Sequence, residues 1–202
     1  FTGTVGTVVG ANWRGKNVMR SRPKKTSRTP TELQLLQRDK FAAITRFLTP
    51  IRGLYNRYFG TNLGVRSRYN IATSYHIKEA ITLVNDVFEI TYNKVLISKG
   101  ELQGVLDPTA VALANTQIKL TWADNSGQGM ALPTDTLLVV IYSEDLNLFE
   151  VFEYQATRED AEVTLSVAAY FSSLEVHCWV SFVNDDRKLS ASSNYLGTVT
   201  LT

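Results

Sequence analysis

The sequence predicts an α+β protein in which an N-terminal β-hairpin and short helices precede an antiparallel β-sandwich. Between residues 29 and 84, apolar residues recur every three to four positions, which is typical of helices that bury one face. From Val87 onward they alternate in short runs separated by turn residues, which is typical of antiparallel strands. We therefore expect a basic hairpin-plus-helices region over residues 1–86 and a β-sandwich domain over residues 87–202.

The opening segment predicts the hairpin. Residues 2–9 are rich in Thr, Val and Gly and read as one strand, and residues 18–22 can run back along it. We expect Gly15 near the tip because glycine readily takes the positive φ that tight hairpin turns need. A lone hairpin is marginally stable in water. This one should therefore lie on another surface, and its Thr/Val-rich strand would suit addition to the sheet edge of another chain.

The helical region begins at a recognisable signal. Thr29 and Glu32 have the spacing of a capping box, in which each side chain binds the backbone N–H of the other residue. Pro30 then falls at the first helical position, where its missing N–H costs nothing. The apolar stripe of this first helix runs to a break at Pro50. Two further short helices are expected over residues 51–59, closed by Gly60, and over residues 75–84.

The second half predicts about seven or eight short strands, the number that an antiparallel sandwich needs. These strands are expected among the apolar runs at residues 88–92, 95–97, 102–106, 118–122, 137–142, 149–154, 163–167, 176–183 and 195–201. The strand pattern of residues 117–202 resembles a fibronectin type III domain, through the 118–122 and 137–142 strands and the closing residues 190–201. This resemblance implies the sandwich fold and leaves function open.

The whole sequence also resembles an uncharacterised family of bacterial proteins. The matching motifs are residues 6–10, Trp13-Arg14-Gly15, residues 20–25, Arg28-Thr29-Pro30, Gln37-Arg38, Phe41, residues 122–127 and Tyr195-Leu196-Gly197. The resemblance supports the hairpin, the helix start and the last strand. It implies no activity.

Charge is distributed unevenly along the chain. Residues 1–70 contain fourteen Lys and Arg residues and two acidic residues, a net charge of +12. Because the whole chain is +2, the remaining 132 residues carry −10. Surfaces of opposite charge on two copies could meet head to tail and propagate into a ring or a fibre. The same charges could instead pair within one chain, and the sequence does not separate these two arrangements.

No catalytic motif, cofactor motif or regular metal-ligand spacing is present, so we expect a protein that is not an enzyme and binds neither cofactor nor metal. His177 and Cys178 are neighbours on a strand and point to opposite faces, which favours a buried structural thiol at Cys178 over a shared metal. Acidic loop residues such as Asp124 and Glu144 are expected to be solvated rather than calcium ligands. No apolar run reaches the roughly 20 residues that a transmembrane helix needs.

Two features indicate a partner surface. The strand over residues 137–142 is apolar on both faces, so its outer face must be covered by the helices, by the hairpin or by another subunit. If Cys178 faces the core, Trp179 faces outward and could anchor an interface. The residues expected at such interfaces are Val5, Val9, Trp13, Arg20, Arg22, Lys24, Lys25, Tyr55, Tyr58, Leu138, Val140 and Trp179.

The function predicted from these features is that of a structural subunit which self-assembles in an extracellular, cell-surface or virion-type assembly, such as a filament. A first alternative is a surface binding or adhesion module that uses the loops of the sandwich. A second, less favoured, is a nucleic-acid-associated protein whose basic region holds phosphates and whose tyrosines stack on bases. The chain opens at Phe1 rather than Met, so a leader for export could precede it.

Overall fold

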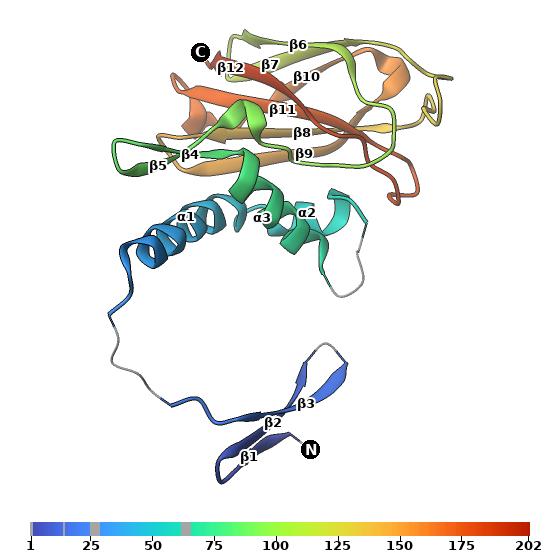
Figure 1. The fold of residues 1–202 in the computed structure, drawn as a ribbon. Helices are drawn as coiled ribbons and strands as arrows, with labels where there is room; N and C mark the ends of the chain where they lie inside the picture. Colours follow the sequence, from blue (N-terminus) through green and yellow to red (C-terminus); the bar gives the residue numbers. More distant parts are fainter. Residues whose placement is uncertain (1, 14, 25–28, 62–65) are drawn as a thin grey trace. The chain divides into compact units, whose positions relative to one another are not determined.

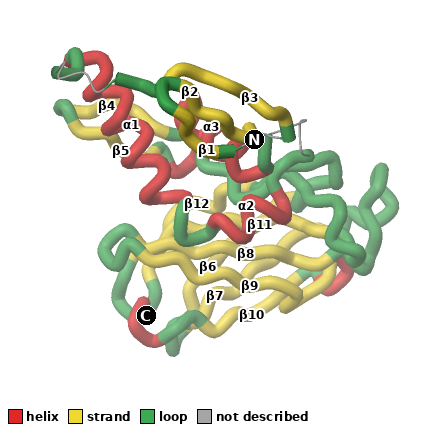
Figure 2. The backbone as a smooth tube through the Cα atoms, turned by 90° about the horizontal axis from the view of Figure 1, so that it is seen from below, coloured by secondary structure: helices red, strands yellow, loops and turns green. Residues whose placement is uncertain are grey.

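The computed structural model describes residues 2–13, 15–24, 29–61 and 66–202. The chain forms two compact units, Phe1–Gln37 and Arg38–Thr202. We call the second unit the body. The predicted division into residues 1–86 and 87–202 stays a prediction. Figure 1 labels the elements in chain order, and Figure 2 shows the helices and strands by class.

The first unit contains a three-stranded antiparallel sheet, which we call the ribbon. Its strands are β1 (Gly3–Val5), β2 (Val8–Trp13) and β3 (Lys16–Ser21), in the order β1-β2-β3. The prediction of a single strand over residues 2–9 is wrong, because the chain turns at Gly6, whose φ is +59°. The predicted turn at Gly15 is confirmed, since Trp13 pairs with Lys16 and Gly15 has a φ of +79°. A two-residue turn of this kind needs positive φ.

Helix α1 (Glu32–Leu48) starts two residues later than predicted. The backbone N–H of Gln34 donates to Thr31 Oγ1 at 3.3 Å, and the N–H of Thr31 donates to Gln34 Oε1 at 3.3 Å. This reciprocal pair is a capping box. The predicted box at Thr29 and Glu32 is wrong because the same three-residue spacing occurs twice in succession, and spacing alone does not choose between the two. The predicted break at Pro50 is confirmed, since α1 ends before it.

Two more helices follow, α2 (Arg52–Tyr58) and α3 (Arg68–Glu79). The predicted helix over residues 75–84 is only partly right. Helix α3 begins earlier, where the Ser67 hydroxyl accepts a hydrogen bond from the Asn70 N–H at 3.2 Å, and it ends at Glu79. Strand β4 (Ile81–Val84) then pairs with β5 (Val87–Ile90) through Asn85 and Asp86, whose φ angles are +47° and +63°. Asn and Asp tolerate this conformation, which a tight hairpin requires.

The remaining strands form two packed antiparallel sheets, which confirms the predicted α+β class with a β-sandwich. One sheet has the order β10-β7-β6 and the other β12-β11-β8-β9. Their bounds are β6 Leu106–Leu113, β7 Gln117–Ala123, β8 Thr136–Ser143, β9 Leu148–Thr157, β10 Glu162–Ser166, β11 Glu175–Val183 and β12 Asn194–Thr200. The predicted strand at 95–97 does not form, and the one at 102–106 is replaced by β6. Strand β6 starts with a bulge, and its Asp107 has a φ of +47°.

Strand β8 has side chains in two separate cores. Leu137, Val139 and Ile141 lie in the core between the two sheets. Leu138, Val140 and Tyr142 lie in a second core, which includes side chains of α1, α2 and α3. In Figure 1 the three helices cover the face of the β8-containing sheet that points away from the other sheet. The body therefore has three layers, and the cover that the all-apolar strand requires comes from the same chain.

A seam of small polar residues joins the helical layer to the sandwich. Ser98 Oγ donates to Ser181 Oγ at 2.7 Å, and Ser190 Oγ donates to the carbonyl of Tyr58, the last residue of α2, at 2.8 Å. Gly100 lies so close that a Cβ atom there would stand 2.1 Å from the Ser190 carbonyl oxygen. Because buried hydroxyls and tight backbone contacts allow little adjustment, this seam fixes the helices on the sheet.

Candidate interaction site

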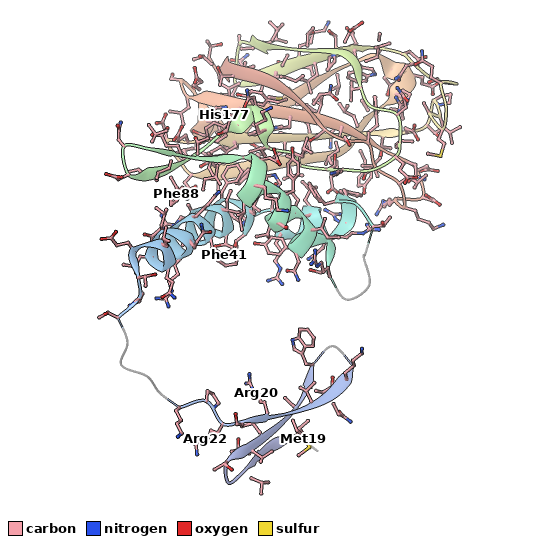
Figure 3. The ribbon with its side chains drawn as sticks, viewed as in Figure 1. Met19, Arg20, Arg22, Phe41, Phe88 and His177 are labelled. Carbon is pink, nitrogen blue, oxygen red and sulfur yellow. The ribbon has the colours of Figure 1, made fainter. Side chains whose placement is uncertain are left out.

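The two faces of the ribbon differ in chemistry. Strand register places directly paired residues on the same face, so the pairs Val9–Arg20 and Trp13–Lys16 share one side. We call this side the cationic face; its residues are Thr4, Val9, Ala11, Trp13, Lys16, Val18 and Arg20. The other, uncharged face holds Gly3, Val5, Val8, Gly10, Asn12, Asn17, Met19 and Ser21. Figure 3 shows Met19 and Arg20 pointing to opposite sides of the ribbon.

The ribbon has almost no buried interior. Among its described residues, 2–13 and 15–24, Gly10 alone is buried. Met19 is 75% exposed, Val5 is 63% exposed and Trp13 is 59% exposed. A small sheet gains stability by burying one apolar face against another layer, and the described residues of the first unit supply none. The side chains of Val5 and Met19 are therefore not covered by any described residue of their own unit.

Several of the predicted interface residues lie on this exposed ribbon. Val9, Trp13 and Arg20 are on the cationic face, and Val5 is on the uncharged face. Arg22 and Lys24 follow β3 and are exposed, and the Arg22 N–H still donates to the Thr7 carbonyl at 2.7 Å. Lys25 lies outside the described residues.

The other predicted interface residues are buried in the body, so placing them at a surface was wrong. Tyr55, Tyr58, Leu138, Val140 and Trp179 are each at most 2% exposed. Trp179 does point away from Cys178, as the strand alternation requires, but it enters the core beneath the helices. The Tyr58 hydroxyl lies 2.8 Å from that of Tyr154.

This burial also bears on the nucleic-acid hypothesis. Tyr55 and Tyr58 cannot stack on bases from within a core. Two of the arginines beside them already have partners. Arg57 forms an ion pair with Glu153, and the Arg52 guanidinium lies 5.0 Å from the centre of the Tyr69 ring. The basic residues that the described helices present are thus partly engaged within the body.

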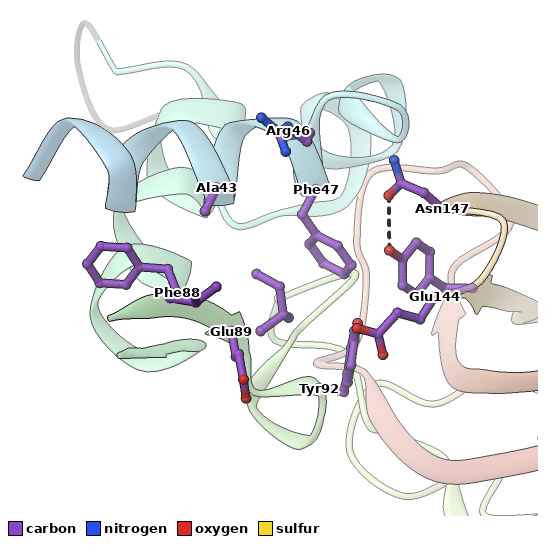
Figure 4. A pocket seen from close by; sticks show the side chains of 11 residues that line it. Ala43, Arg46, Phe47, Phe88, Glu89, Tyr92, Glu144 and Asn147 are labelled. Carbon is purple, nitrogen blue, oxygen red and sulfur yellow. Dashed lines mark hydrogen bonds between the residues drawn. The ribbon is translucent and has the colours of Figure 1, made fainter. Parts of the chain in front are cut away.

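A groove of about 480 Å³ opens in the body between α1 and the β4–β5 hairpin (Figure 4). Phe47 of α1, Phe88 and Ile90 of β5, and Tyr92 and Tyr142 form its apolar walls. Glu89 and Glu144 are exposed beside it, and Arg46 lies on the helix across from them. The remaining lining residues are Ala43, Val87 and Asn147. The sequence did not reveal this groove because its walls come from segments that lie far apart in the chain.

The groove combines aromatic walls with negative charge. On its hairpin and turn walls the groove is lined by two acidic residues, Glu89 and Glu144, and by neither Lys nor Arg. The Tyr142 hydroxyl donates to Asn147 Oδ1 at 3.0 Å, which fixes the turn between β8 and β9. Burial, Tyr142 and the Glu144 carboxylate raise the pKa of Tyr92, so its hydroxyl stays protonated. Such a surface suits a ligand that is both apolar and basic.

His177 and Cys178 point to different layers, as predicted. His177 stacks on Tyr92 with ring centres 3.7 Å apart, and its Nδ1 lies 2.8 Å from the Tyr195 hydroxyl. Cys178 is buried in the sandwich core, and burial raises the pKa of its thiol to about 12. The prediction of a buried structural thiol is confirmed. Within residues 2–13, 15–24, 29–61 and 66–202, no three His, Cys, Asp or Glu side chains gather as metal ligands would.

Arg158 and Asp135 form a fully buried ion pair at one end of the sandwich. Arg158 Nη2 and Nε lie 3.0 Å and 3.1 Å from Asp135 Oδ2. The guanidinium also donates to the carbonyls of Gln103 and Gly104 and lies 4.0 Å from the centre of the Phe182 ring. Because both side chains are 0% exposed, this network ties loops together and offers no access to a ligand.

The geometry defines an antiparallel β-sandwich with a layer of helices on one sheet. None of the helices in the described part of the chain is long and apolar enough to cross a bilayer. The chain belongs to a family of unknown function, DUF6266, whose profile matches residues 1–197. No curated protein matches the sequence.

Solved structures similar to the chain include fibronectin type III domains. The FN5 domain of Drosophila Lar is 11% identical with a TM-score of 0.35, and the match covers 48% of this chain and 92% of that chain. The fn3 domain of the human collagen alpha-1(XX) chain is 10% identical with a TM-score of 0.38, covering 52% of this chain and 89% of that one. The fn3 domain of human contactin 1 is 6% identical with a TM-score of 0.36, covering 52% and 83%.

Proposed function

We propose that this protein is a non-enzymatic structural subunit that self-assembles, with the ribbon of one copy packing on a neighbouring copy in an extracellular, cell-surface or virion-type assembly. The observation that carries the proposal is the exposed ribbon. It presents apolar side chains on both faces, and its own unit provides no second layer among the described residues. Covering it in an assembly would remove that apolar surface from water.

Charge supports contact between copies. Residues 1–37 carry seven Lys and Arg residues and one acidic residue, a net charge of +6. Because the chain is +2 overall, residues 38–202 carry −4. Attraction between the first unit of one copy and the body of the next would set orientation and association rate, while apolar contact would supply most of the affinity. A contact between two different surfaces propagates, so rings or filaments are the expected products.

The test is the mass of the full chain in solution across a wide concentration range, by light scattering, with electron microscopy of the concentrated sample. We expect the mean mass to rise with concentration and regular particles to appear. The variant Val5→Asp/Met19→Asp places charge on the uncharged face and should shift association to higher concentration.

The matched control is Gln128→Asp/Gln155→Asp, which adds the same charge at exposed positions of the body. It should associate like the original chain. A strictly monomeric protein at the highest concentration would refute the proposal. If Val5→Asp/Met19→Asp, the control variant and the original chain all associate equally, the uncharged face is not part of the contact.

A further inference from the structure

We infer that the groove between α1 and the β4–β5 hairpin is the docking site for the cationic face of the ribbon of a second copy. The inference rests on the proposed self-assembly and names the two surfaces that meet. The occupant of the groove is inferred from charge complementarity and from the apolar side chains present on each surface.

The charges of the two surfaces are opposite. The ribbon segment after the Gly15 turn contains Lys16, Arg20, Arg22 and Lys24, which are exposed and have no acidic residue among them. The hairpin and turn walls of the groove contribute two carboxylates, Glu89 and Glu144, and no Lys or Arg. Arg46 lies on the helix wall, opposite Glu89 and Glu144. A basic side chain entering along the acidic wall is thus attracted on that side and kept away from Arg46.

The apolar parts also correspond. On the cationic face, Val9 and Val18 flank Arg20, because Val9 pairs with Arg20 and Val18 is two residues away on β3. In the groove, Phe88 and Ile90 of β5 and Phe47 of α1 stand beside the acidic rim. Docking would cover aliphatic side chains with aromatic ones and bring Arg20 near Glu89 or Glu144. The adjacent tip of the hairpin, where Val87 is 61% exposed and Leu83 is 46% exposed, would extend the apolar contact.

The hairpin itself favours such a role. It is a two-stranded ribbon, and a ribbon of that size is only marginally stable without a cover. Ile81 is buried and Phe88 and Ile90 are half-buried, so one face is held by the body while the tip projects from it. A partner bound in the groove would hold the hairpin against α1.

The experiment uses two charge-reversal variants of the full chain. Glu89→Lys/Glu144→Lys reverses the groove, and Lys16→Glu/Arg20→Glu reverses the cationic face; all four side chains are exposed, so we expect unchanged thermal unfolding of the body. Sedimentation velocity should show that each variant alone associates at least about tenfold more weakly than the original chain. An equimolar mixture of the two should regain association, because each groove then meets a ribbon of opposite charge.

The control variant Glu159→Lys/Asp185→Lys makes the same change in net charge at exposed positions that do not line the groove, and it should associate like the original chain. If the original chain associates and the groove and ribbon variants associate equally well, the docking inference is overturned while self-assembly stands through another surface. If the mixture fails to recover, the two surfaces do not meet. If the original chain never associates, both the proposed function and this inference fail.

Discussion

The ribbon and the body differ in how far the apolar side chains of their strands are buried. Strand β8 is apolar on both faces, and the body covers one face with a second sheet and the other with three helices. The ribbon also carries apolar residues on both faces, yet Val5 and Met19 are mostly exposed. Because the described residues of the first unit supply no second layer, we expect the apolar residues of the ribbon to be covered by a contact outside that unit.

The largest effect expected from this comparison is on stability. Val140→Asp would place a charge in a site that is 0% exposed beneath the helices, and we expect a loss of at least about 4 kcal/mol in the free energy of unfolding. Val5→Asp makes the same chemical change on the ribbon, where the side chain is 63% exposed, and should change it by less than about 0.5 kcal/mol. Urea unfolding followed by tryptophan fluorescence measures both. Similar losses for the two would show that the ribbon is as well covered as the body.

The buried ion pair should respond strongly as well. Asp135→Ala leaves the Arg158 guanidinium without its carboxylate in a site with 0% exposure, and we expect a cost of about 3–5 kcal/mol. Asp186→Ala, which removes the partner of the exposed Lys188, should leave urea unfolding unchanged. If the Asp135→Ala protein is as stable as the original, the Arg158 guanidinium must be hydrated in the variant.

His76 gives the body a defined pH dependence. It is a buried residue of α3, and its Nδ1 lies 2.8 Å from the Ala72 carbonyl while its Nε2 accepts from the Leu96 N–H at 3.2 Å. Burial lowers its pKa from 6.5 to about 4, so below pH 6.5 the unfolded chain binds a proton that the folded chain does not. The contribution of neutral, buried His76 to the free energy of unfolding is therefore fully present above pH 6.5 and is lost as the pH falls toward 4. We expect a loss of about 2 kcal/mol between pH 7.5 and pH 5.

Unfolding by urea at both pH values measures the His76 contribution. A His76→Asn variant, itself less stable, should lose much less between pH 7.5 and pH 5, because it lacks the titrating group. An identical loss in the variant would assign the pH dependence to other residues.

The smallest effect distinguishes the two possible helix starts. Thr31→Ala should cost about 1 kcal/mol in the local stability of the first turn of α1, because it removes the hydroxyl that accepts from the Gln34 N–H. Thr29→Ala, at the position that the sequence favoured, should have no such effect. Amide hydrogen exchange of residues 33–35 reads this directly. Faster exchange in the Thr29→Ala variant alone would show that the helix is capped at Thr29 and begins earlier in the chain.

Much of the body was predictable from periodicity. Strand β8 follows a continuous apolar run and the other strands from β7 to β12 follow largely alternating ones, and each was expected at nearly its observed position. Strand β6 was not found, because Asp107 and Pro108 interrupt its pattern at the bulge. The β4–β5 hairpin was missed although Asn85 and Asp86 are typical of a tight turn, since Ile77, Ala80, Ile81 and Val84 also have helical spacing.

The candidate site was predictable only in part. The exposed ribbon residues were expected from composition, but Trp179 and Leu138 were placed at a surface because alternation tells which face a side chain takes and not what covers that face. The groove depends on Phe47, Phe88 and Tyr142, which come from three distant segments and meet only after folding. A pattern along one strand or one helix contains no information about such a meeting.

The most direct test of the central claim compares hydrogen exchange in the two regions as the full chain is concentrated. The account predicts that ribbon amides in residues 8–13 and 16–21 exchange rapidly in dilute solution and become protected as concentration rises, while strands β8 and β11 are equally protected throughout. Ribbon protection that is the same at every concentration would contradict the account, because the ribbon would then need no second copy.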